Sequence, residues 1–64
     1  MKIKRNEHFI QFISSDDSGE FKISIQKDCS QVRLETGNGE AFINTNLKEL
    51  KAMRDCLNEV INQY

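Results

Sequence analysis

Apolar and polar residues alternate along the middle of the chain. In FKISIQ, Phe21, Ile23 and Ile25 fall on one side of an extended segment and three polar residues fall on the other. The segment QVRLET repeats the pattern, with Val32 and Leu34 between polar neighbours. Because successive side chains of a strand point to opposite faces, this period of two is typical of half-buried strands. We therefore predict strands over residues 20–27 and 31–36.

Two further segments complete the predicted sheet. The aromatic and β-branched run FIQFI predicts a strand over residues 7–14, and residues 40–44 predict a fourth. The turn-forming segments SSDDSG, DCS and TGNGE separate the four strands. Asn38-Gly39 is a strong hairpin signal because both residues tolerate positive φ. Connections this short favour antiparallel pairing of sequential strands, so we expect a meander.

The period changes after the fourth strand. Asn46 is a favourable N-cap and Glu49 follows three residues later, as in a capping box. Apolar residues then recur at helical spacing, which predicts a helix over residues 46–63 with one broad apolar stripe. The stripe comprises Leu47, Leu50, Met53, Leu57, Val60, Ile61 and Tyr64.

These elements predict a single α+β domain over residues 1–64, a four-stranded antiparallel β-meander followed by one C-terminal α-helix. We expect the helix to lie on one sheet face and cover Phe21, Ile23, Ile25, Val32 and Leu34. The stripe is also wide enough to pack on a second copy. A chain of 64 residues buries only ~60% of its unfolded surface, so we also expect a homodimer.

Composition narrows the class of protein. Hydrophobic residues make up 38% and charged residues 30%, an ordinary globular balance. Nine basic and ten acidic residues give a formal net charge of −1, so binding of an anionic partner would need a local basic face. The N-terminal MKIKRNEHFI lacks the apolar core of a secretory signal. We expect a cytoplasmic protein with reduced cysteines and no membrane partner.

The sequence offers little support for catalysis or metal binding. His8 is the only histidine, and nothing in the spacing assembles a nucleophile or carboxylate with it. Cys29 and Cys56 form neither a CxxC motif nor a zinc-binding spacing. We therefore expect no enzyme activity, no cofactor and no metal.

The polar half of the strand alternation is the candidate binding surface. Lys22 and Arg33 point outward from neighbouring strands, and Lys27 lies at a strand end. Lys4 and Arg5, with Lys2, could extend this basic group. Single-strand nucleic-acid binders combine cations with aromatic platforms, and the candidate platforms are Phe9, Phe12 and Phe42. A face that is merely solvated fits the same pattern.

Two segments carry a family resemblance. GEFKISIQKD resembles the second strand of the PC4-like transcriptional coactivators, and GEAFINTNLKEL resembles their fourth strand and helix start. In the second segment, Phe42 stands at an apolar strand position, and Leu47 and Leu50 stand at the apolar anchors of the first helical turn. The resemblance is one of pattern over about residues 8–62.

The resemblance implies a dimeric single-stranded DNA-binding protein acting in transcription or in DNA replication or recombination. Lys22, Lys27 and Arg33 would then contact phosphates. The alternative is a small protein–protein interaction module, such as an inhibitor, immunity or regulatory protein, possibly phage-encoded. Such a module would dock a protein through an uncovered sheet face or strand edge.

Overall fold

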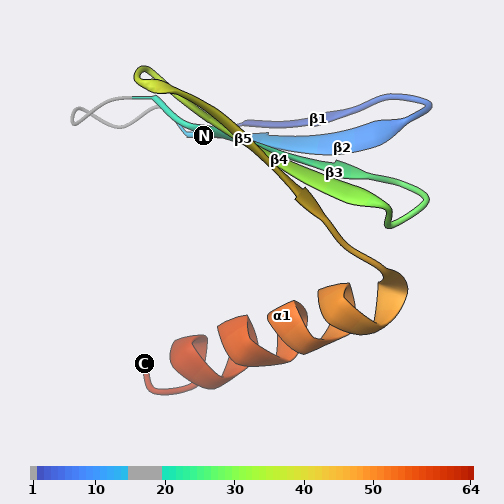
Figure 1. The fold of residues 1–64 in the computed structure, drawn as a ribbon. Helices are drawn as coiled ribbons and strands as arrows, with labels where there is room; N and C mark the ends of the chain where they lie inside the picture. The colour runs from blue at the N-terminus through green and yellow to red at the C-terminus, as the bar shows by residue number, and fades with distance from the viewer. Residues whose placement is uncertain (1, 15–19) are drawn as a thin grey trace.

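The computed structural model describes residues 2–14 and 20–64 and shows an antiparallel sheet followed by one helix (Figure 1). The elements are β1 (Lys2–Arg5), β2 (Phe9–Ile13), β3 (Lys22–Gln26), β4 (Gln31–Thr36), β5 (Gly39–Asn44) and α1 (Leu47–Ile61). Most of the predicted SSDDSG turn, residues 15–19, lies outside the described residues. The α+β class and the C-terminal helix are confirmed.

The sheet is a meander in which each strand pairs antiparallel with the next, in the order β1-β2-β3-β4-β5. The β4–β5 hairpin closes where the sequence predicts a tight turn. Its two turn residues are Gly37 and Asn38, one position earlier than the predicted pair, and Thr36 pairs with Gly39. Gly39 adopts a φ of 140°, a value that glycine reaches without steric cost.

The structure adds a fifth strand that the sequence analysis missed. The segment Lys2–Arg5 pairs with β2 along its whole length. Its sequence, KIKR, carries one apolar residue among three cations, which hides the alternation of a half-buried strand. Lysines are common on strands at the edge of a sheet, because their charge opposes pairing with another chain. β1 is therefore recognisable only from its pairing with β2 in the folded sheet.

The β3–β4 turn is tied to the segment that leads into the helix. Thr45 donates from its backbone N–H to the carbonyl of Ser30 at 3.0 Å, and from its hydroxyl to the carbonyl of Cys29 at 2.8 Å. Asp28 accepts hydrogen bonds from the backbone N–H and the hydroxyl of Ser30. Cys29 itself has a φ of 67°, in the left-handed region.

The helix begins where the sequence predicts. Asn46 is the N-cap, and its side-chain oxygen accepts a hydrogen bond from the backbone N–H of Glu49 at 2.9 Å. This bond satisfies one of the N–H groups that have no partner in the first turn. The helix ends at Ile61, two residues before the predicted boundary. It is not long and apolar enough to cross a membrane.

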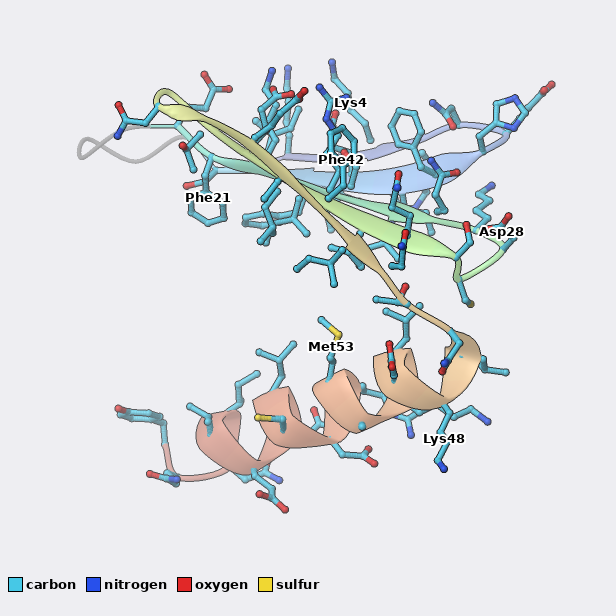
Figure 2. The ribbon with its side chains drawn as sticks, viewed as in Figure 1. Lys4, Phe21, Asp28, Phe42, Lys48 and Met53 are labelled. Atoms are coloured by element: carbon cyan, nitrogen blue, oxygen red, sulfur yellow. The ribbon has the colours of Figure 1, made fainter. Side chains whose placement is uncertain are left out.

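The helix does not cover the sheet, and the expectation that it would is wrong. Among the described residues, no Cα of α1 lies within 8 Å of a strand Cα, and α1 contains no buried residue. Figures 1 and 2 show the helix beneath the sheet, with Met53 directed toward it and Lys48 directed away. The hydrophobic residues buried among the described ones are Ile13 and Val32.

Candidate functional site on the polar sheet face

The pairing register sorts the strand residues into two faces. Lys4, Gln11, Ser24, Arg33 and Phe42 form one row that crosses all five strands. Because paired residues of antiparallel strands share a face, these five side chains lie on the same side of the sheet. Figure 2 shows Lys4 on the side away from the helix and Phe21 on the side toward it. We call the side that carries this row the polar face.

A shallow hollow of about 130 Å³ lies over the middle of the polar face. Phe9 contributes an aromatic ring to it from β2, and Phe42 contributes another from β5. Between these rings the lining is polar: Gln11, Ser24, Gln26, Gln31 and Arg33. An apolar ring on each side of a hydrogen-bonding floor suits a flat ligand whose edges carry donors and acceptors.

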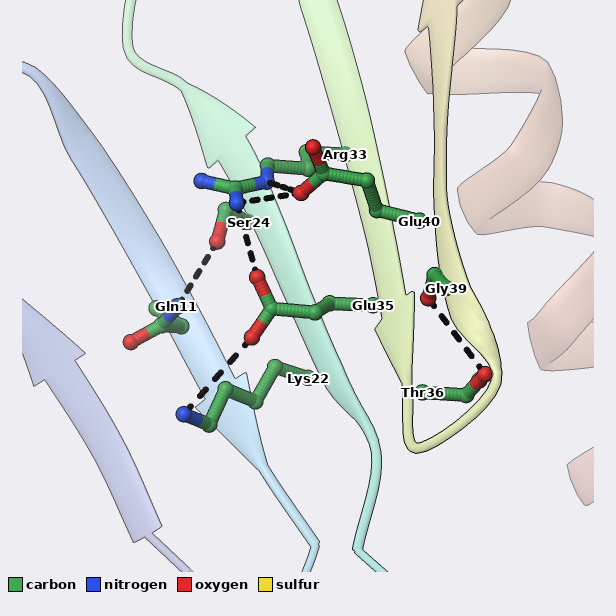
Figure 3. Close-up of polar contacts among 8 residues, drawn as sticks. All are labelled: Gln11, Lys22, Ser24, Arg33, Glu35, Thr36, Gly39 and Glu40. Carbon is green, nitrogen blue, oxygen red and sulfur yellow. Dashed lines mark hydrogen bonds and ion pairs between the residues drawn. The ribbon is translucent and has the colours of Figure 1, made fainter.

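Arg33 is the electrostatic centre of this face (Figure 3). Its guanidinium donates from Nε to Glu40 at 3.0 Å and lies 2.8 Å from a Glu35 carboxylate oxygen. The hydrogen bond with Glu40 raises the pKa of Arg33 above its ordinary value, and the two carboxylate charges act in the same direction. Lys22 reaches the other oxygen of Glu35 at 3.7 Å. All these side chains are partly exposed, so water and salt screen the pairs.

Arg33 also stacks near an aromatic ring. Its guanidinium carbon lies 5.5 Å from the centroid of the Phe42 ring, within the range of a cation–π contact. Phe42 is 54% exposed, so about half of its surface stays accessible to a ligand. In the same row, Gln11 donates from its side-chain amide to the Ser24 hydroxyl at 2.9 Å. This bond fixes part of the floor between the two rings.

The structure brings some of the predicted basic residues together and separates others. Lys4, Lys22 and Arg33 lie on the polar face, as does Lys2. Arg5 pairs with Ile10 and therefore lies on the opposite face, because neighbouring residues of a strand cannot share a face. The polar face thus carries the cations Lys2, Lys4, Lys22 and Arg33 and the carboxylates of Glu35 and Glu40.

Lys27 lies outside this group, in the turn that follows β3. The three candidate aromatic platforms also separate: Phe9 and Phe42 are on the polar face, whereas Phe12 pairs with Ile3 and Ile23 on the other. Phe12 packs there on Phe21, with 5.7 Å between ring centroids. The separation of Phe9 from Phe12 was predictable from FIQFI, because residues three apart in a strand point to opposite faces.

The remaining candidates for chemistry stay isolated. His8 is exposed, and its Nε2 lies 4.0 Å from Oε2 of the neighbouring Glu7. Cys29 and Cys56 are free thiols. Among residues 2–14 and 20–64, no three His, Cys, Asp or Glu side chains gather as a metal site would require. In comparisons with protein-family models, curated proteins and solved structures, nothing matches this chain.

Proposed function

We propose that this protein is a single-stranded nucleic-acid-binding module that uses the polar face and works as a homodimer. The observation that carries the proposal is the pair Phe9 and Phe42 on either side of a hydrogen-bonding hollow, with Arg33 beside one ring. Proteins that bind unpaired strands stack bases on aromatic side chains and hold phosphates with cations. The pattern-level resemblance to PC4-like coactivators, which no comparison tests, points to the same activity.

The charge distribution on the polar face supports weak, salt-sensitive binding. Lys4 lies on the same row as Arg33 and Phe42 and has no ion-pair partner among the described residues. Lys22 and Arg33 are shared with carboxylates. A phosphate would have to compete with Glu35 and Glu40 for these two cations. We therefore expect lower affinity than for a face of unpaired cations.

The binding test uses a fluorescently labelled oligothymidine and the intact chain. We expect an increase in anisotropy at low salt, with log K falling by about 0.7 for each phosphate contact per decade of salt. Phe42→Leu keeps an apolar side chain but removes the ring, so it should weaken binding about 5- to 150-fold, the range for losing one stacked base. Phe42→Tyr keeps the ring and is the matched control. Absence of binding by the wild type at low salt would refute the proposal.

A second candidate function rests on the exposed edge of the sheet. All six residues of β5 are exposed, and its outer edge has no strand partner among the described residues. An open edge can accept a strand from a protein partner by β-augmentation. Under this alternative, the effect of Phe42→Leu would be measured on the binding of a captured protein partner instead of an oligonucleotide. Adding single-stranded DNA as a competitor should leave the binding of that protein unchanged.

A further inference from the structure

Two apolar surfaces of this chain face solvent. One is on the sheet, on the face opposite the polar face; we call it the sheet patch, and its exposed members are Ile3, Ile10, Ile25, Leu34 and Ile43, with Phe21 just before β3 on the same side (Figure 2). The other is the helix stripe, in which Leu47, Met53, Leu57, Val60, Ile61 and Tyr64 are between 44% and 104% exposed. Water-exposed apolar surface on this scale is uncommon in a monomer.

We propose that this chain forms a two-fold symmetric dimer. In it, the helix stripe of each copy packs on the sheet patch of the other copy. This interface belongs to the homodimer included in the proposed function, and to that extent it rests on that proposal. It does not depend on nucleic-acid binding, because the patch and the polar face lie on opposite sides of the sheet.

The connection between sheet and helix explains why one chain does not bury both surfaces itself. Only Thr45 and Asn46 separate β5 from α1. Thr45 is hydrogen-bonded through its N–H and its hydroxyl to the β3–β4 turn, and Asn46 caps the helix. Thr45 is thus fixed to the sheet and Asn46 to the helix, which leaves no free residue between them to let α1 swing onto the sheet patch. Redirecting the connection at Thr45 would break its two hydrogen bonds to the β3–β4 turn.

The exposed area is sufficient for a stable dimer. Twelve side chains belong to the two surfaces and are at least 36% exposed. At roughly 60–100 Å² of apolar surface each, they amount to about 700–1,200 Å² per chain. Each partner in a standard stable interface buries about 800 Å², so the two surfaces together reach the area that such an interface needs.

The shapes and chemistry of the two surfaces favour a second copy as the occupant. A helix stripe on a half-apolar sheet is the common way to complete a two-layer α+β core. This chain has one helix stripe and one sheet patch, and both are uncovered. In two copies related by a two-fold axis, each helix stripe therefore has a sheet patch to pack on, and no apolar surface is left without a partner. Among the described residues, the hydrophobic side chains buried within one copy are Ile13, on the polar face, and Val32, on the face of the sheet patch. So little burial is unusual in a chain of 64 residues, and chains of this size commonly depend on oligomerisation.

The primary test is sedimentation equilibrium of the wild type at chain concentrations between about 1 and 200 µM, which cover the dissociation constants of many specific interfaces. We expect the molecular mass of a dimer at the highest concentration. Leu57→Asp places a charge in the helix stripe, and Ile25→Asp places one in the sheet patch. Each should shift the dimer–monomer equilibrium toward monomer by at least tenfold. Glu59→Lys, on the polar side of α1, is the matched control and should leave the mass unchanged.

A wild type that stays monomeric at 200 µM would overturn the inference, as would a dimer that survives both charge variants. If only one of the two variants dissociates, the interface does not contain both surfaces and the inference as stated fails. Helix content from circular dichroism confirms that each variant is folded, and Leu57→Ala gives a milder change if Leu57→Asp unfolds. Phe42→Leu should remain dimeric, so loss of oligonucleotide binding and loss of the dimer are separable results.

Discussion

The guanidinium carbon of Arg33 lies 5.5 Å from the ring centroid of Phe42, one strand away. The same guanidinium pairs with Glu35 from its own strand and with Glu40 from β5. Arg33 is therefore shared between an aromatic ring that a base could stack on and two carboxylates that repel phosphate. The balance between these contacts determines how available the polar face is to an anion.

Removing one carboxylate should make the polar face a better anion site. We expect Glu40→Gln to strengthen oligonucleotide binding about two- to fivefold at low salt, a small change because solvent screens exposed ion pairs. Fluorescence anisotropy measures the change. Glu59→Gln on the helix removes a carboxylate far from the face in the fold and is the control. Equal effects of the two substitutions would show that net charge, and not Arg33, governs binding.

Cys29 occupies a backbone conformation that favours glycine. Its φ of 67° costs a residue with a Cβ about 1 kcal/mol. We expect Cys29→Gly to raise the free energy of unfolding by roughly 0.5–1 kcal/mol, and Cys29→Val to lower it because a β-branched side chain tolerates this region poorly. Urea denaturation followed by circular dichroism measures both. If glycine and valine had the same effect, backbone strain would not be the determinant at this position.

The N-cap of α1 should matter more than usual, because the helix receives little support from packing within the chain. Asn46→Ala removes the acceptor for the Glu49 N–H and should cost about 1 kcal/mol of helix stability. Asn46→Ser keeps an acceptor and should retain most of it. Ellipticity at 222 nm during thermal unfolding provides the comparison, and identical curves for alanine and serine would contradict a capping role.

Asp28 should make stability depend on pH at acidic values. The hydroxyl and backbone N–H of Ser30 donate to its carboxylate, which lowers the pKa of Asp28 below its ordinary value of 3.8. A carboxyl group with a lowered folded-state pKa stabilises the fold above the unfolded-state value, and this contribution is lost as pH falls through the folded-state value. The urea midpoints of the wild type and Asp28→Asn should therefore differ at pH 6, and the difference should shrink only as the pH falls below 3.8. A difference that already shrinks well above pH 3.8 would assign the effect to another group.

The local elements were largely predictable from the chain itself. Alternation in FKISIQ and QVRLET located β3 and β4, and Asn46 with Glu49 located the helix start, because these signals act over a few residues. The edge strand β1 was not predictable, since its pairing depends on β2 and its own pattern is mostly charged. The placement of Phe9 with Phe42 was partly predictable: alternation separates Phe9 from Phe12, but only the register brings two distant strands into one hollow.

The sequence by itself determined the alternation of β3 and β4, the β4–β5 turn to within one residue, the helix cap and the existence of an apolar stripe on α1, because each is set by local backbone preference and side-chain alternation. Only the tertiary structure decided that Arg33 stacks near Phe42, that Arg5 leaves the polar face, and that α1 stands away from its own sheet. The last of these follows from a two-residue connection in which Thr45 is hydrogen-bonded to the β3–β4 turn. Hydrogen bonds to a turn formed earlier in the chain set the direction of that connection, and hydrophobic pattern alone carries no information about direction.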